Sequence, residues 1–341
     1  MSQLSQLIQN KFSFLINDKR DLPFLIVCFQ TLFILIPIII ALFLTHEPSY
    51  WWLLLYLPVF LFLLGPYLAI LHYFSHKSFW SKDYRKLGNF FMTFFGVLYG
   101  LPPKGYFVHH IGMHHREENG PDDLSSTLKY DADNFLHWNI YFSKFLFFNF
   151  IDLSVYFYKK KQYKLMRYAL GGHLFFFAMI ALLALINFNA AMIVFVIPTI
   201  VCWFAMISGN WAQHAFIDNA DTESPYTMSH SCIENDYNKI CFNDGFHITH
   251  HIHPRMHWTE MPLDFEENKD EYISRKAVVF RKLDWQKVWF LLMFKRYDVL
   301  AKYYVQREDE SSQLSKDEII AHLKSRTKRV RSLSSIKKQT T

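Results

Sequence analysis

The segment that decides the fold is WWLLLYLPVFLFLLGPYLAILHYFSH, residues 51–76, in which a long apolar run ends on a pair of histidines. The run Trp51–Leu71 reaches the roughly 20 apolar residues that a membrane-spanning helix needs. His72 and His76 follow at once, and a spacing of four residues puts both imidazoles on one side of a helix. The segment therefore predicts a membrane helix that presents metal ligands at one end.

Three further runs are long and apolar enough to span, at 23–44, 168–186 and 190–209. Hydrophobic residues make up 51% of the chain and aromatic residues 18%, which does not describe a soluble domain of this size. The sequence thus predicts an all-α, polytopic membrane protein with four transmembrane helices. The shorter apolar piece 87–101 is expected to form a re-entrant or interfacial helix, and 138–158, with its Lys144 and Asp152, an interfacial helix.

Basic residues indicate the orientation, because Lys and Arg concentrate in short cytoplasmic segments. They precede the first and third spans and follow the second, whereas the links 45–50 and 187–189 contain none. Both termini and every histidine cluster are then expected on the cytoplasmic side. Such a multi-pass protein would lie in the endoplasmic reticulum of a eukaryote or the inner membrane of a bacterium.

We expect three regions along the chain. Residues 1–22 form a cytoplasmic lead-in, 23–300 the membrane domain with its histidine-rich cap, and 301–341 a charged tail. The tail is either attracted to anionic membrane lipids or a solvated, largely disordered terminus. The net charge of +6 fits positive-inside loops and calls for no nucleic acid.

Three more histidine clusters accompany the first. They are His110-Ile-Gly-Met-His114-His115, Asn210-Trp-Ala-Gln-His214 and His247-Ile-Thr-His250-His251. Imidazole is the usual side-chain ligand for iron, copper, nickel and zinc. The nine histidines are too many for one tetrahedral site, so they predict a di-metal cap.

This arrangement of spans and histidine boxes resembles the membrane fatty acid desaturase superfamily, whose relatives include the alkane hydroxylases, over residues 67–261. The spacing between His110 and His114 is similar to the hydroxylase branch, since most desaturases have one residue fewer there. Asn210 and His214 resemble the pair of animal stearoyl-type desaturases, in which the asparagine holds a metal-bound water. The third region, from Gly245 to His251, resembles the desaturase third box.

The resemblance implies two iron ions, ligated by the nine histidines, and an O₂-dependent attack on C–H bonds of a lipid acyl chain. Zinc is redox-inert and cannot do this chemistry. Desaturation is the leading interpretation, and a hydroxylase or oxidative decarboxylase that uses the same irons is the alternative. A non-enzymatic metal transporter or sensor is a third, although transporter sites lie near the bilayer midplane.

Electrons are expected from a separate ferredoxin, cytochrome b5-like protein or reductase. The chain has no Gly-rich dinucleotide fingerprint, no haem-attachment motif and no iron–sulfur cysteine run, so haem, flavin and nicotinamide sites are not expected in it.

Histidine ligands need outer partners that hold their tautomers. Asp244 is the best placed of the candidates, because it comes just before the Gly-Phe-His turn. Four other histidines, His46, His137, His230 and His322, are expected at the surface. The other candidates close to the boxes are Glu117, Asp122, Asp123, Gln213, Asp218, Glu260, His109, His253 and His257.

Overall fold

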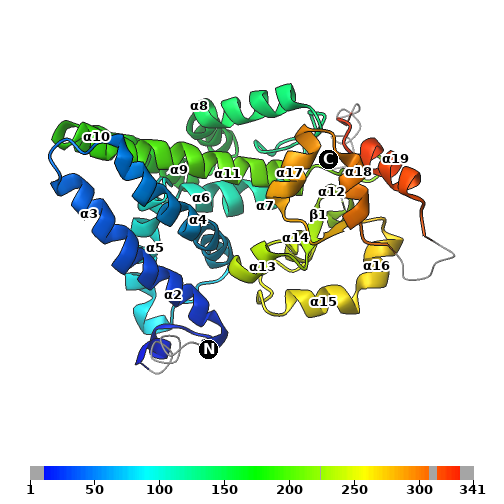
Figure 1. The fold of residues 1–341 in the computed structure, drawn as a ribbon, viewed down its shortest axis with the longest axis horizontal. Coiled ribbons are helices and arrows are strands. Elements are labelled where there is room, and N and C mark those ends of the chain that lie inside the picture. The colour runs from blue at the N-terminus through cyan, green and yellow to red at the C-terminus, as the bar shows by residue number, and fades with distance from the viewer. Residues whose placement is uncertain (1–10, 223, 307–312, 331–341) are drawn as a thin grey trace. The chain divides into compact units, whose positions relative to one another are not determined.

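The computed structural model describes residues 11–222, 224–306 and 313–330. The chain forms two compact units, drawn as one ribbon in Figure 1. Unit 1 covers Met1–Gly112 and Phe150–Phe204, and unit 2 covers Met113–Asn149 and Ala205–Thr341. The first residues, 1–10, and the last, 331–341, with Arg331, Lys337 and Lys338 of the expected basic tail, lie outside the described residues.

Within the described residues, five helices are long and apolar enough to cross a membrane. They are Lys19–Leu44, Tyr50–His76, Phe135–Lys159, Tyr163–Ile186 and Phe188–Gln213. Four of them contain the four runs expected from the sequence. The fifth, Phe135–Lys159, contains the segment expected at the interface, so five helices qualify by length and composition where four were expected.

Unit 1 consists of helices, several of which continue into one another. In chain order they are η1 Ser13–Leu15, η2 Lys19–Asp21, α2 Leu22–Gln30, η3 Thr31–Leu35, α3 Ile36–Leu44, η4 Tyr50–Trp52, α4 Leu53–His76, η5 Lys82–Tyr84, α5 Arg85–Leu98, α6 Gly105–His109, α9 Tyr163–Ile186, α10 Phe188–Ala191 and η7 Met192–Val196. Three elements contain residues of both units, namely η6 His110–His114, α8 Phe135–Lys159 and α11 Ile197–Gln213.

Tyrosine hydroxyls join the helices of unit 1 inside its apolar core. Tyr67 of α4 donates to the carbonyl of Met92 in α5 over 2.7 Å, and its ring stacks on Tyr99 at 4.2 Å. The Tyr99 hydroxyl lies 2.8 Å from Thr31 Oγ1 of the first helical run. These bonds satisfy buried hydroxyls that would otherwise cost free energy. Helix α5 has 14 residues, about 21 Å at 1.5 Å per residue, too short to cross the hydrocarbon core alone.

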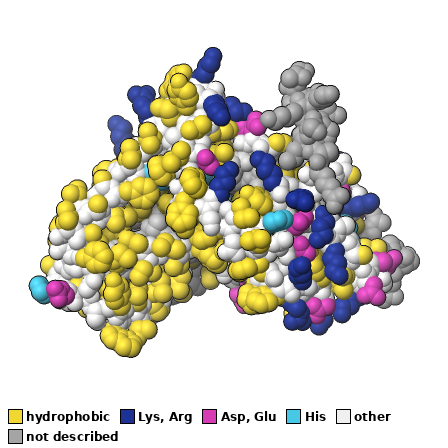
Figure 2. Space-filling model, turned by 90° about the horizontal axis from the view of Figure 1, so that it is seen from above, with side chains coloured by type: hydrophobic (Ala, Val, Ile, Leu, Met, Phe, Trp, Pro, Cys, Tyr) yellow, Lys and Arg dark blue, Asp and Glu magenta, His cyan; other side chains and the backbone are white. Residues whose placement is uncertain are grey.

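The surface of unit 1 is apolar, as a surface facing lipid should be. Leu44 and Leu185 are more than 80% exposed, and Trp51, Phe62 and Ile186 are also exposed. Hydrophobic side chains cover much of the helical surface on the face drawn in Figure 2. Contiguous apolar surface on this scale is unusual for a soluble protein. The chain is an integral membrane protein.

Unit 2 contains short helices around a small sheet. They are α7 His115–Glu117, α12 Pro225–Met228, β1 His230–Ile233, α13 Asp236–Ile240, α14 His247–Ile252, α15 Met261–Glu267, α16 Lys269–Ser274, β2 Val278–Arg281, α17 Trp285–Met293, α18 Tyr297–Leu300, η8 Ala301–Tyr303 and α19 Lys316–Arg326. Strands β1 and β2 are parallel, with His230 opposite Val278. The expectation of an all-α fold was therefore wrong for this small sheet, whose two strands are only four residues long.

The C-terminal segment corrects a second expectation. Helix α19 starts with a capping box between Ser315 and Glu318, and its Ile319 and Leu323 are buried in the core of unit 2. Arg326 is 4% exposed and forms a 2.7 Å ion pair with Asp218. The interpretation of 301–341 as a largely disordered terminus is therefore wrong for 316–330.

Candidate metal centre

Unit 1 brings three of the expected histidines together. His72 and His76 lie one turn apart near the end of α4, and the ring of His110 lies 4.5 Å from that of His72. Nε2 of His76 and Nε2 of His110 are 3.2 Å apart. One ring nitrogen from each of the three lies within 4.8 Å of the others. This is the arrangement of three ligands around one ion.

The second box lies on one helical run from Gly105 to Glu117, in which His110–His114 form a π-helical turn. A π-turn accommodates an extra residue in a helix and is frequent at functional sites. The turn covers His110–His114, the spacing that has one residue more than most desaturases have. Asn119 follows in the left-handed conformation, with φ 59°, which asparagine tolerates and which turns the chain back toward the box.

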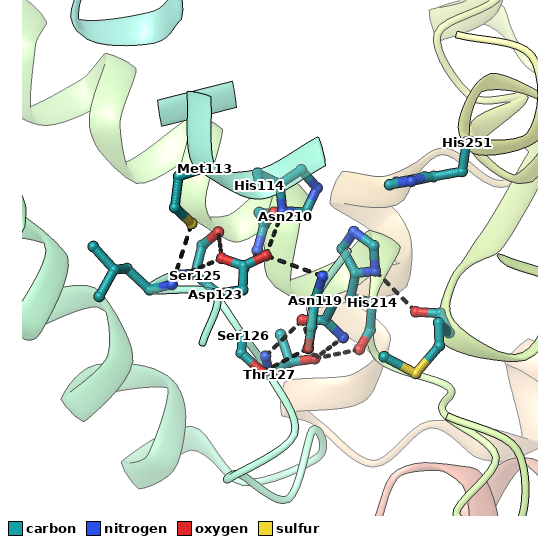
Figure 3. A network of polar contacts seen from close by, with 12 residues as sticks. Met113, His114, Asn119, Asp123, Ser125, Ser126, Thr127, Asn210, His214 and His251 are labelled. Atoms are coloured by element: carbon teal, nitrogen blue, oxygen red, sulfur yellow. Dashed lines mark hydrogen bonds and ion pairs between the residues drawn. The ribbon is translucent and has the colours of Figure 1, made fainter. Parts of the chain in front are cut away.

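Unit 2 gathers the other six histidines. One ring nitrogen from each of His114, His214 and His251 lies within 4.8 Å of the others. Figure 3 shows these three rings converging on one space. His247 adds a fourth nitrogen, because its Nε2 is 3.2 Å from Nε2 of His214 and 3.1 Å from that of His251. His115 and His250 form a pair with their Nε2 atoms 3.1 Å apart.

The hydrogen bonds of the Nδ1 atoms of His114 and His214 show which tautomer each imidazole adopts. Nδ1 of His114 lies 2.7 Å from the carboxylate of Asp123, and Nδ1 of His214 lies 2.8 Å from the carbonyl of Met228. Both partners are acceptors, so both Nδ1 atoms carry the proton and both Nε2 atoms present a lone pair. Outer hydrogen bonds of this kind orient metal-bound histidines.

Asp123 belongs to a loop, residues 119–127, in which Asn119, Ser125, Ser126 and Thr127 are also buried and hydrogen-bonded. The backbone N–H of Asn119 donates to the same carboxylate oxygen as His114, and the N–H and Oγ of Ser125 donate to the other. The hydroxyl of Thr127 donates to the carbonyl of His214 over 2.7 Å. The loop thereby fixes two of the histidines in unit 2 (Figure 3).

The third region is positioned by a glycine. A Cβ on Gly245 would lie 2.3 Å from the carbonyl oxygen of Cys232 in β1, so no other residue fits there without movement. The N–H of Cys232 donates to the Gly245 carbonyl over 2.8 Å. The close approach of β1 sets where α14 begins, and α14 carries His247, His250 and His251.

Asn210 lies in the last turn of α11, four residues before His214. The backbone N–H of His214 donates to the carbonyl of Asn210 over 3.2 Å, so the two residues lie one helical turn apart. The Asn210 side-chain amide donates to the carbonyl of Ser125 over 3.0 Å and to the hydroxyl of Tyr141 over 2.6 Å. No donor to its carbonyl oxygen Oδ1 is found among the described residues, so Oδ1 can accept a hydrogen bond from another group.

The residues of unit 2 fit a bound metal. Metal–nitrogen bonds of about 2.1 Å place neighbouring ligand nitrogens about 3 Å apart, close to the observed separations. A neutral imidazole has one N–H only, and Nε2 of His247 faces two other Nε2 atoms, so hydrogen bonds alone do not explain the cluster. Burial, and then the nearby His114, lower the pKa of His214 to about 3, which keeps the imidazole neutral as a ligand must be.

Several other candidates have partners of their own. Asp244 accepts from the hydroxyl of Tyr237 over 2.8 Å, and Asp218 pairs with Arg326. Nδ1 of His257 lies 2.8 Å from Thr259 Oγ1, and His253 lies 4.0 Å from Asp264. The half-buried Glu117, Gln213 and His109 and the exposed Asp122 and Glu260 lie in or next to the box segments.

The sequence misled on the burial of His230 and gave no sign of a role for Tyr141. His230, expected at the surface, is 1% exposed in β1, and burial lowers its pKa to about 3. Tyr141, which bonds Asn210, received no role because it lies 69 positions away in an apolar helix.

The comparison with known families agrees with this geometry. The fatty acid desaturase family matches residues 48–282, more than half of the chain. The chain belongs to the fatty acid desaturase family. No curated protein and no solved structure matches it.

Membership of the desaturase family makes the chain a membrane oxidoreductase that acts on lipids and binds metal through its histidines. It also implies an acyl substrate and a source of electrons.

Proposed function

We propose that the chain is an O₂-dependent di-iron enzyme that desaturates a lipid acyl chain with electrons from a separate donor. The observation that carries the proposal is the convergence of four imidazoles, those of His114, His214, His247 and His251. The first two donate hydrogen bonds from Nδ1 to acceptors, so their Nε2 atoms are available to a metal. All nine box histidines are proposed as iron ligands. Neutral imidazoles suit iron, and family membership supplies the class of reaction.

Bound iron would supply the redox chemistry that O₂ activation needs. The protein's own groups have other tasks. Asp123 and the Met228 carbonyl hold the tautomers of His114 and His214, and Thr127 of the same loop as Asp123 bonds the His214 carbonyl. Asn210 is proposed to accept from a metal-bound water through Oδ1, because its amide nitrogen is held by Ser125 and Tyr141.

Hydroxylation is the second candidate, on the spacing of the second box. The π-helical turn over His110–His114 accommodates an extra residue without breaking the helical run, so the spacing alone does not require a different reaction. We therefore keep desaturation as the proposal. Product analysis by lipid mass spectrometry after expression decides between an alkene, an alcohol and a product shortened by loss of CO₂.

Metal analysis tests the site itself. Purified protein is expected to contain about two irons per chain, and His115→Ala or His250→Ala is expected to lower the iron content and abolish turnover. The exposed His46→Ala is the matched control and should retain both. Stoichiometric zinc after expression in iron-replete cells would count against the oxygen chemistry and favour a transporter or sensor.

The proposed topology follows the basic residues. We propose that both termini and the histidine boxes face the cytoplasm, in the endoplasmic reticulum of a eukaryote or the inner membrane of a bacterium. The electron donor, a ferredoxin, cytochrome b5-like protein or reductase, would then approach from the cytoplasmic side.

A further inference from the structure

Unit 1 contains a cavity of about 240 Å³ between α4, α5 and the segment that leads into α6. Leu71 and Phe74 of α4 and Met92 of α5 form part of its apolar wall. Tyr67 also lines the cavity, and its hydroxyl donates to the Met92 carbonyl, which ties α4 to α5 at this wall. Apolar walls of this kind hold a hydrocarbon chain by burying it.

The cavity lining includes direct neighbours of the histidines of unit 1. Leu71 and Ser75 of the lining come directly before His72 and His76 on α4. Tyr106, also in the lining, stacks on His110 with ring centroids 5.2 Å apart. A molecule in the cavity therefore lies against Tyr106, whose ring packs on the proposed iron ligand His110.

The polar part of the cavity has one sign of charge. Arg85 and Lys104 both line it, and no aspartate or glutamate does. Both cations are exposed, and neither forms an ion pair with a carboxylate in the part of the chain that the structure describes. Ser78 and Asn89 add uncharged groups able to bond an oxyanion.

We propose that this cavity binds the anionic head group, a carboxylate or a phosphate, of a single-chain acyl lipid, with the first methylenes against the apolar wall. The inference rests on the proposed function and narrows its substrate to charged amphiphiles. Uncharged molecules such as an alkane or a ceramide lack the group that Arg85 and Lys104 would bind. An oxyanion between two such cations forms charge-assisted hydrogen bonds, which are stronger than neutral ones.

Binding to the purified, metal-free full chain in a non-ionic detergent tests the inference without any turnover. Radiolabelled dodecanoate is the tracer, and unlabelled dodecanoate, dodecyl phosphate and dodecanol compete for it. We expect both anions to compete at concentrations at least about tenfold below that of dodecanol. The stronger of the two anions identifies the head group as carboxylate or phosphate.

Variants locate the site. R85Q/K104Q is expected to weaken binding of the anions about tenfold or more and to leave dodecanol competition nearly unchanged. The matched control K86Q/R167Q removes two exposed cations of the same unit that do not line the cavity, and should bind as the original chain does. T93F fills the cavity and should weaken all three ligands. If T93F does not fold, the R85Q/K104Q pair at exposed positions still decides.

Two results overturn the inference. One is the absence of saturable binding of either anion, and the other is anion binding that R85Q/K104Q leaves unchanged. Either result leaves the proposed reaction standing, because iron content and products are measured separately. Conversely, a protein without iron or products can still bind anions here.

Discussion

Asp123 accepts a hydrogen bond from Nδ1 of His114 over 2.7 Å, and both side chains are almost completely buried. The same carboxylate accepts from the backbone of Asn119 and twice from Ser125. Every one of these partners is a donor, so the site is built for a negative charge. The loop that holds Asp123 thereby fixes the direction in which His114 presents its lone pair.

Asp123→Asn is expected to lower metal affinity about 10- to 100-fold, the usual effect of losing an outer partner. The asparagine NH₂ would face a donor, whichever way the amide turned, and would misalign His114. Metal content after dialysis against a graded chelator series measures the effect. Asp270→Asn, an exposed acid of the same unit, is the control. Equal metal retention in both variants would show that Asp123 does not orient a ligand.

Asn210 separates a catalytic from a structural interpretation. His214→Ala is expected to lose both iron and turnover, whereas Asn210→Ala should keep most iron and lose turnover about 10- to 100-fold. Activity is measured in membranes with the electron donor supplied.

Tyr141→Phe provides the matched comparison, because it removes the hydroxyl that accepts from Asn210 and donates to Ser125. If Asn210 holds a metal-bound water, Tyr141→Phe should lose less turnover than Asn210→Ala. Equal losses would mean that Asn210 acts only by positioning the Ser125 loop, and normal turnover in Asn210→Ala would remove its catalytic role altogether.

The histidine clusters could be predicted from the sequence because their spacing is local. His72 and His76, or His247 and His251, share a helix face whatever the rest of the fold does. The four long apolar runs could be predicted for the same reason, since bilayer thickness sets their length. Asp123, by contrast, reaches His114 only because the chain reverses at Asn119 and the loop folds back on itself. Sequence proximity favoured Asp244 over Asp123, and Asp244 accepts a hydrogen bond from Tyr237.

Long-range contacts explain the other differences. Strands β1 and β2 are four residues each and pair across more than 40 intervening residues, so no local pattern marks them as a sheet. Helix α19 is rich in charge, which is typical of a solvated terminus. Its order depends on the two apolar residues Ile319 and Leu323 and on the pairing of Arg326 with Asp218.

Helix α8 provides a topology prediction. Basic residues predict that positions 129 and 161, which flank Phe135–Lys159, face the same side, while a crossing α8 would put them on opposite sides. Single cysteines replacing the exposed Lys129, Lys161 and Glu47 can be labelled in intact vesicles, since the four natural cysteines are buried. We expect Lys129→Cys and Lys161→Cys to react from the cytoplasmic side only, and Glu47→Cys from the other. Opposite labelling of the first two would establish a fifth span and overturn the proposed topology.

Arg326 links the C-terminal helix to the segment that follows His214. Its guanidinium pairs with Asp218, and its backbone carbonyl accepts from the N–H of Ile217 over 2.9 Å. Arg326→Ala removes a buried guanidinium and its charge-assisted bond to the partly exposed Asp218, and is expected to destabilise unit 2 by about 2 kcal/mol. The temperature of unfolding in detergent should fall by several degrees, and iron should be released at a lower temperature because His214 lies four residues before Asp218.

Arg329→Ala, which changes an exposed arginine three residues after Arg326, is the control. If Arg326→Ala unfolds and releases iron at the temperature of the original chain, the C-terminal helix does not hold the His214 segment in place.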